Sequence, residues 1–454
     1  RGRVNGGDAT APAAAAGVRD HAVRRRERPV ERRSSVLAWL GTVMLCLSVF
    51  SGNFRQVTGW LPVDRVVMAA FLLTVLYINW RYERPRFRVV HAILLAQVLW
   101  IAGSAALGAT LLRADSFYAA LDQVIVPSVL FTIAPIAFHS AADRLLLLRA
   151  LAITALYVGV MSTLQSLGIG FLLFPRYLAE AAVAGEITRA VGPSLQVASN
   201  GAMLTMCIAP LIMLLKRSTG WWRLIAALGI VAVSSGAFLT LTRSVWLAWI
   251  LAVGVYVALD PTLRRPALRL LGALAVVLAL LLVAVPPLFE VVSDRFTTQR
   301  SLDDRSTTNI AALSMLDTHP ILGVGWGRFL DEVDSYVRQQ DLVPLTTTHI
   351  PAHNIVLSRA AETGAVGAAL FLASLIAGPI ASVVRSWRGV DREWGIILLS
   401  AFGAWLSVAM LTPMGYTFPN YFLWLLAGIV AVPAGATVTT SFRTKRRRAS
   451  DADV

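Results

Sequence analysis

Long apolar runs recur along nearly the whole chain, and they limit its fold more than any other feature. Most runs cover roughly 18–25 residues, enough for a helix to cross a hydrocarbon core about 30 Å thick. Hydrophobic residues make up 56% of the 454 residues and charged residues only 15%, against about 45–50% and about 25% in soluble domains. The pattern predicts an all-α polytopic membrane protein with about twelve transmembrane helices. We expect spans near 36–53, 61–80, 89–111, 120–138, 145–168, 196–215, 222–241, 244–259, 267–289, 355–384, 393–411 and 420–440.

One long polar interval, Asp304 to Gly364, interrupts these runs. It separates nine expected transmembrane helices in 35–289 from three more in 354–441. We expect the connection between them, residues 290–353, to be one large loop that contains short helices. The Ala/Arg/Gly-rich residues 1–34 and the basic residues 442–454 are typical of terminal tails outside the bundle.

The charge pattern predicts which side of the membrane each connection faces. The net charge is +15, and the basic residues gather in both tails and in the connections 81–88, 216–223, 263–269 and 385–392. Cytoplasmic connections carry an excess of Lys and Arg, so both termini are expected in the cytoplasm and the loop 290–353 outside it. The basic charge therefore indicates topology and attraction to anionic membrane lipids, and no nucleic-acid partner is expected.

The large loop itself shows local helix signals. A short helix is expected from Ser306 to Asp317, with Ser306 as its N-cap and Pro320 closing it. A glycine-rich turn follows at 323–327, and a second helix is expected over 328–340 because Phe329, Val333 and Tyr336 share one face. The turn lacks a Walker lysine and follows no Rossmann strand, so nucleotide binding is not expected.

His353 stands immediately before an apolar span, at the expected boundary between membrane and water. A histidine there can act as a general base, because its reference pKa of about 6.5 lets it take a proton from a hydroxyl near neutral pH. The alternative is a solvated loop histidine. His349 lies four residues earlier, but Pro351 between them disfavours a helical metal site, so no metal is expected.

Three arginines are candidate ligands of an anion. Arg243 lies at an expected extracytoplasmic turn between two spans, where a planar, permanently charged guanidinium suits a phosphate or diphosphate. The alternative is an arginine that extends to the interface. Arg305 is expected at the start of the loop helix, where the helix N-terminus also favours anions. Arg328 follows the glycine turn and is a weaker candidate, for which a solvated surface role is the alternative.

Arg359 and Glu362 fall about one helical turn apart in the span that follows His353. A local ion pair inside the bundle is expected from this spacing. The alternative is that Glu362 orients His353.

Three motifs in this part of the chain together resemble the O-antigen ligase and O-antigen polymerase family of bacterial envelope glycosyltransferases. They are Thr242-Arg243-Ser244 with Trp246, the stretch MLDTHPILGVGWG at 315–327, and Pro351-Ala-His-Asn354 followed by Glu362-Thr-Gly364. The resemblance covers roughly 235–370, about a third of the chain.

The resemblance implies a metal-independent, inverting transferase of the bacterial plasma (inner) membrane that needs no cofactor. Its donor would be a glycan on undecaprenyl diphosphate, and its acceptor a hydroxyl of a glycan or of a lipid-linked saccharide. His353 would be the essential histidine, and Arg243 and Arg305 would bind the diphosphate. Arg328, Asn354 and Glu362 would support them. Ligase and polymerase are not separated by these residues.

A transporter or flippase of lipid-linked glycans is the alternative from a different class. Such proteins are commonly built from two repeated halves, and no internal repeat is evident in the sequence.

Overall fold

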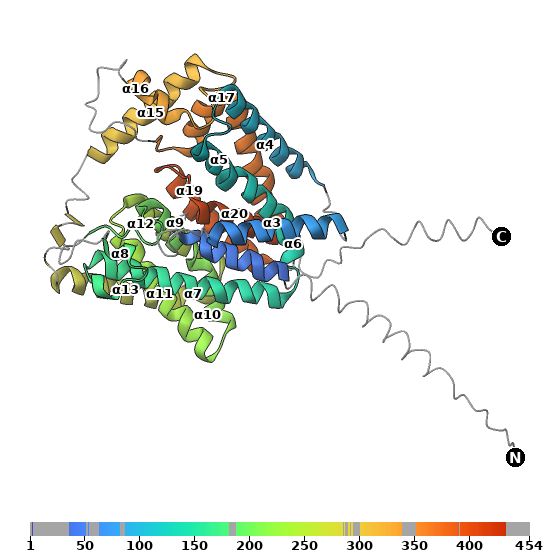
Figure 1. The fold of residues 1–454 in the computed structure, drawn as a ribbon. Coiled ribbons are helices and arrows are strands. Elements are labelled where there is room, and N and C mark those ends of the chain that lie inside the picture. Colours follow the sequence, from blue (N-terminus) through green and yellow to red (C-terminus); the bar gives the residue numbers. More distant parts are fainter. Residues whose placement is uncertain are drawn as a thin grey trace.

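The computed structural model is helical in every regular element that it describes (Figure 1). It describes residues 36–50, 63–81, 87–180, 188–284, 300–337, 351–389 and 391–432, together with 2, 53, 286, 289–290 and 292–293. The two expected tails, His349 and the end of the second loop helix lie outside these residues. The longer helices are α3 (Val63–Arg81), α4 (Val89–Leu107), α5 (Ala114–Ala120) continuing through η2 (Leu121–Ile125) into α6 (Val126–Ala137), α7 (Ala141–Ser166), α9 (Val197–Met206) with α10 (Ile208–Arg217), α11 (Gly220–Leu239), α12 (Arg243–Leu259), α13 (Arg264–Ala284), α15 (Arg300–Thr318), α16 (Phe329–Val337), α17 (Ile355–Leu375) continuing through η5 (Ile376–Ile380) into α18 (Ala381–Ser386), α19 (Arg392–Ala409) and α20 (Thr417–Ala431).

Six helices among the described residues are long and apolar enough to cross a membrane. They are Val89–Leu107, Ala114–Ala137, Ala141–Ser166, Val197–Arg217, Gly220–Leu239 and Ile355–Ser386. Shorter apolar helices cover Val36–Phe50, Arg243–Leu259 and Thr417–Ala431. Each of the twelve expected spans overlaps a helix. By length and composition, however, only the six helices named above in the described part of the chain are suited to crossing a membrane. Twelve crossings therefore stay a prediction.

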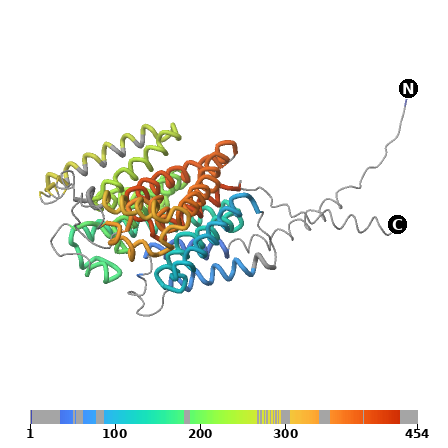
Figure 2. Tube along the Cα trace, turned by 90° about the horizontal axis from the view of Figure 1, so that it is seen from above, coloured from blue at the N-terminus to red at the C-terminus, as the bar shows by residue number. Residues whose placement is uncertain are grey.

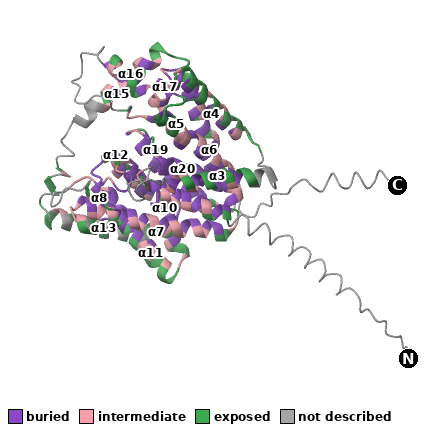
Figure 3. Cartoon of the chain, in the orientation of Figure 1, coloured by how far each residue is buried: buried purple, intermediate pink, exposed green. Residues whose placement is uncertain are grey.

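Helix α20 forms the centre of the bundle. All fifteen of its residues are buried, and α6, α9, α18 and α19 pack around it (Figure 3). Seen from above, the red C-terminal helices lie between the blue N-terminal helices and the yellow-green α12 and α13 (Figure 2). A helix that is apolar on every side can face either lipid or other helices in a membrane, so the central position of α20 is decided by its packing partners and not by its hydropathy alone.

One end of the bundle collects basic side chains. Arg385 donates to the last carbonyl of α20, that of Ala431, at 2.8 Å. Arg144, at the start of α7, pairs with Asp391 at 3.1 Å. Arg88, just before α4, reaches the same Ala431 carbonyl at 3.2 Å. Arg88, Arg385 and Asp391 belong to connections for which the sequence predicts the cytoplasmic side, and the structure gathers them at one end.

The opposite end contains a buried polar network. The two carboxylate oxygens of Asp122 in η2 accept hydrogen bonds from the two terminal nitrogens of Arg65, at 2.5 and 2.7 Å. It also accepts the Tyr421 hydroxyl at 2.7 Å. The network therefore ties α3 and α20 to η2, a π-helical turn whose wider hydrogen-bond pattern re-aims its side chains.

We expect Asp122→Ala to lower the free energy of unfolding by about 1.5–3 kcal/mol, because it removes hydrogen bonds to a charged group and leaves Asp64, at 3.6 Å, as the remaining carboxylate beside Arg65. The thermal unfolding midpoint in detergent measures this loss. The double variant Arg65→Met with Asp122→Leu should recover part of the stability, since it also removes the positive charge of Arg65, although Asp64 then loses Arg65 as its partner. A midpoint unchanged in Asp122→Ala would contradict the role of the pair.

The loop helices α15 and α16 lie over the outer half of α17 (Figure 1). Their shared core contains Ala312 and Met315 of α15 and Phe329 and Val333 of α16, packed near Ala361 of α17. The expected second helix is present over Phe329–Val337, and half-buried Tyr336 packs against the same core as Phe329 and Val333, as predicted; Val337 is also buried there.

The predicted start of the first loop helix is wrong. Helix α15 begins at Arg300, so Ser306 lies inside it and is not an N-cap. No Gly or Pro interrupts 300–305, which lets the helix extend further back than its capping signal. Pro320 closes the helix as predicted, after Thr318.

Candidate functional site

The three principal candidates come from three separate segments and lie at the same end of the bundle. Arg243 is the first residue of α12. The last residue of that helix, Leu259, accepts from Arg392 through its carbonyl, which places this other end of α12 beside the basic end. His353 precedes α17, which runs through η5 and α18 to Arg385 at the basic end. Arg305 is in the second turn of α15. All three are therefore far from the basic end.

Thr308 connects His353 to α15. The hydroxyl of Thr308 lies 3.4 Å from Nδ1 of His353, and Thr308 is 5% exposed. It follows Arg305 by three residues, so both lie on the same face of the helix, and the hydroxyl also donates to the Arg305 carbonyl at 3.3 Å. The imidazole thus stands beside the helix face that presents Arg305.

Arg305 and Arg243 are close enough for their charges to repel. Burial lowers the pKa of the Arg305 guanidinium, and the positive charge of Arg243 lowers it further. Arginine is effectively always protonated in proteins, so Arg305 keeps its positive charge near neutral pH despite the lowered pKa. No described carboxylate forms an ion pair with Arg305. Two like charges brought together in this way favour an anion between them.

The prediction that Arg305 lies at a helix N-terminus is wrong. Arg305 lies five residues after the first residue of α15, and the backbone N–H groups at the N-terminus of that helix belong to earlier residues. An anion beside Arg305 would therefore be held by the charge of Arg305 itself and by that of Arg243.

The turn before Arg243 is held by another arginine. Arg189 donates from Nε to the Thr240 carbonyl at 3.2 Å and from a terminal nitrogen to the Thr242 hydroxyl at 2.7 Å. Between these threonines, Leu241 has a positive φ of 50°, a conformation that costs energy for a bulky residue. Arg189 therefore stabilises the strained turn that delivers Arg243.

Asn354 caps the helix that follows His353. Its Oδ1 accepts from the backbone N–H groups of Val356 at 2.9 Å and Leu357 at 3.1 Å, as N-cap residues do. The cap fixes where α17 begins, and thereby the direction in which His353 leaves the helix.

Two further candidates have structural partners. Arg328 pairs with Glu332 one turn later in a part-buried ion pair at 2.5 Å. Glu362 accepts the backbone N–H of Gly327 at 3.1 Å. The charges of Arg359 and Glu362 interact, but the expected pair is not a direct contact. Arg359 donates to Gln123 and lies over the Trp326 ring at 4.6 Å. A contact with Gln123, 236 positions away in the sequence, is not foreseeable from local spacing.

Thr308 and Arg189 were not singled out from the sequence. For Thr308, the three-residue spacing from Arg305 could have indicated that both side chains lie on the same helix face. Arg189 carried none, because its contact with the 240–242 turn joins distant parts of the chain. No group of three or more His, Cys, Asp or Glu side chains suited to a metal occurs in the described part of the chain.

A bundle of apolar helices with clustered arginines and a histidine at one end defines a membrane protein suited to an anionic substrate at the membrane surface. Residues 228–372, about a third of the chain, match the family model described as O-antigen ligase, and this part of the chain is therefore similar to O-antigen ligases. The match confirms the resemblance found at 235–370 and favours a glycan-transferring protein over a transporter. No curated protein matches the chain.

Proposed function

We propose that this protein transfers a glycan from undecaprenyl diphosphate to an acceptor hydroxyl on the extracytoplasmic side of the bacterial plasma membrane. The observation that carries the proposal is the meeting of Arg243, Arg305 and His353 from three segments of the region similar to O-antigen ligases. Two fixed cations suit a diphosphate, and an imidazole beside them suits an acceptor hydroxyl.

The proposed reaction is a single displacement at the anomeric carbon. His353 takes the proton of the acceptor hydroxyl while the acceptor oxygen bonds to the anomeric carbon. The bond from that carbon to the diphosphate oxygen breaks, and the leaving diphosphate keeps the electron pair. Arg243 and Arg305 stabilise its negative charge. Attack from the face opposite the leaving group inverts the anomeric carbon. The two guanidinium groups supply the positive charge, so the step needs no metal ion.

The proposed orientation follows from the charge of the two ends. The basic end, with Arg88, Arg144 and Arg385, would face the cytoplasm and its anionic lipids. The end with Arg243 and His353 would then face outward, where a lipid-linked donor presents its diphosphate at the membrane boundary.

Deletion of the gene tests the proposal and separates its two forms. Long polymer stranded on undecaprenyl diphosphate would identify a ligase, whereas single repeat units without polymer would identify a polymerase. Unchanged lipid-linked and surface glycans would contradict both.

Thr308→Val should lower kcat for transfer several-fold and leave donor affinity unchanged. The valine keeps the shape of threonine but removes the hydroxyl beside Nδ1 of His353, a contact whose length of 3.4 Å limits its strength. Steady-state kinetics with the purified protein measure both quantities. An unaltered kcat would show that the hydroxyl does not orient the imidazole.

A further inference from the structure

Helix α17 is broken near its middle. Arg359 lies in the same helix, about one and a half turns before the break. Gly364 has φ 69° and ψ −175°, values outside the helical region. A break of this kind removes helical partners from the carbonyls just before it, and buried carbonyls must find other donors. The donors that replace them come from two other segments.

The first segment is the glycine turn. The N–H groups of Val324 and Gly325 donate to the carbonyls of Ala361 at 2.8 Å and Glu362 at 3.0 Å. In the other direction, the N–H of Ala365 donates to the Pro320 carbonyl at 2.8 Å. The turn and the break therefore pair backbone to backbone, in place of the helical bonds that α17 gives up.

The glycines of the turn are required by this close approach. Gly323 has φ 67°, and a Cβ there would lie 2.4 Å from the carbonyl carbon of Glu362. Gly327 has φ 75°, and its Cβ would lie 2.1 Å from the hydroxyl oxygen of Ser116. The GxGxG spacing therefore reflects docking onto α17 and α5.

The second segment is α4 and the turn after it. The Trp100 indole donates to the Thr363 carbonyl at 2.9 Å. The Ser104 hydroxyl donates to the Glu362 carbonyl at 3.3 Å and accepts the Trp326 N–H at 3.0 Å. The Thr110 hydroxyl donates to the Trp326 carbonyl at 2.6 Å. Helix α4 lies outside residues 228–372, so the N-terminal half of the chain supplies the receptor for this turn.

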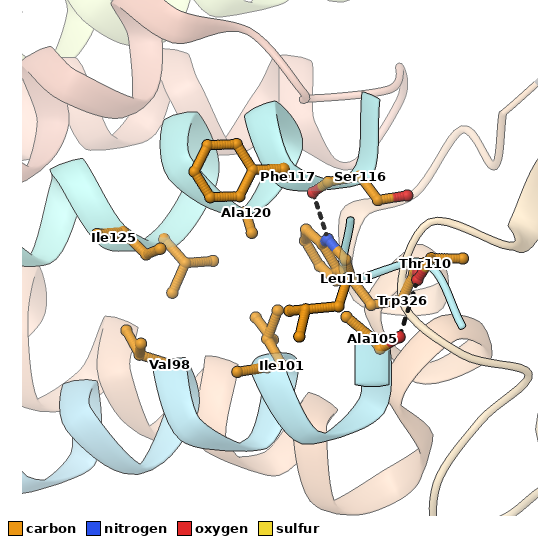
Figure 4. A pocket seen from close by; sticks show the side chains of 12 residues that line it. Val98, Ile101, Ala105, Thr110, Leu111, Ser116, Phe117, Ala120, Ile125 and Trp326 are labelled. Atoms are coloured by element: carbon orange, nitrogen blue, oxygen red, sulfur yellow. Dashed lines mark hydrogen bonds between the residues drawn. The ribbon is translucent and has the colours of Figure 1, made fainter. Parts of the chain in front are cut away.

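Trp326 anchors the turn from inside. Its ring is 1% exposed, forms part of the wall of an apolar pocket between α4 and α5, and donates to the Ser116 carbonyl at 3.0 Å (Figure 4). The Arg359 guanidinium lies over this ring. The Glu362 carboxylate accepts the N–H of Gly327, the next residue. The turn is thus fixed on both sides of its tryptophan.

The two segments that meet at this junction are those that carry candidate site residues. Helix α15 carries Arg305 and Thr308 and ends at Thr318, just before the turn begins. The outer part of α17 runs from Asn354, beside His353, to the break at Gly364. The junction therefore sets how the helix with Arg305 lies against the helix that follows His353.

We propose that Glu362 is a positioning residue, whose bond to the Gly327 N–H holds the glycine turn in the break of α17 and so fixes Arg305 relative to His353. The expected effect on glycan transfer rests on the proposed function, whereas the role of Glu362 in holding the turn against α17 does not. Small displacements of aligned groups cost large factors in rate, about a hundredfold for 1 Å.

The test compares Glu362→Gln with Glu362→Met. Glutamine keeps an oxygen acceptor of the same shape for the Gly327 N–H, whereas methionine keeps the length but supplies no oxygen. We expect Glu362→Met to lower kcat about tenfold or more with little change in KM for the lipid-linked donor. Glu362→Gln should retain at least half of the wild-type kcat. If Glu362→Gln is as slow as Glu362→Met, the carboxylate acts through its charge and the inference is wrong.

Amide hydrogen exchange gives a second readout that does not depend on glycan transfer. We expect the peptide 319–328 to exchange faster in Glu362→Met than in the wild-type protein, with Glu362→Gln unchanged. Equal exchange in all three proteins would overturn the inference whatever their activities. Wild-type protein without any transfer activity would overturn only the proposed function, because the exchange comparison would still test the junction.

Discussion

His353→Ala should abolish glycan transfer while the protein still folds and inserts in the membrane. Loss of a general base costs about 10²- to 10⁴-fold in rate. His353 is only half-buried beside Thr308, so its replacement leaves little cavity in the core. Transfer of labelled glycan by purified protein measures the loss, and elution as a single species in gel filtration reports the fold.

His319→Ala is the matched control for this prediction. His319 lies in the same loop, is exposed, and has the hydroxyls of Thr318 and Tyr336 beside its Nδ1, at 3.0 and 3.4 Å. It should keep near wild-type transfer. Full transfer by His353→Ala would remove this histidine from the mechanism, and equal losses in both variants would indicate a general effect on the loop.

Arg243→Ala and Arg305→Ala should each weaken binding of the diphosphate-lipid donor about 10- to 100-fold, because a hydrogen bond to a charged group contributes about 1.5–3 kcal/mol. Binding of undecaprenyl diphosphate to the purified protein measures the affinity directly. Since both guanidinium groups are proposed to bind one diphosphate, the double variant should lose less than the product of the two single effects.

Arg176→Ala serves as the control for charge alone, because Arg176 is an exposed arginine between η3 (Gly170–Leu172) and α8 (Tyr177–Glu180). It should bind the donor as the wild type does. Donor affinity and turnover that are unchanged in Arg243→Ala would rule out its diphosphate role. A loss in Arg176→Ala as large as in Arg305→Ala would indicate a diffuse electrostatic effect.

The helical membrane character of this protein was predictable from sequence because it depends on local properties. Run length and hydropathy locate α4, α7 and α11 within a few residues. The charged connections also predicted which helix ends lie together, as Arg88 and Arg385 show at the basic end. The central position of α20 was not predictable in this way, since every span is apolar and only packing decides which one is enclosed.

The candidate site was predictable as a set of residues but not as an arrangement. His353, Arg243 and Arg305 were recognised by residue type and motif. The contact of Thr308 with His353 and that of Arg189 with the 240–242 turn depend on how distant segments meet. The glycine turn and Glu362 were both noticed in the sequence, yet nothing local showed that the turn docks into a break of α17 at Gly364, two residues after Glu362. Local spacing suggested an Arg359–Glu362 pair, and tertiary contacts gave each side chain a different partner.

Reconstitution of the wild-type protein in liposomes tests the proposed transfer most directly. The liposomes would receive a radiolabelled glycan on undecaprenyl diphosphate together with a glycan acceptor. We predict that a new glycosidic bond forms with inverted anomeric configuration, and that one undecaprenyl diphosphate is released for each bond made. Movement of the intact lipid-linked glycan across the bilayer, without a new glycosidic bond, would contradict the proposal and identify a transporter.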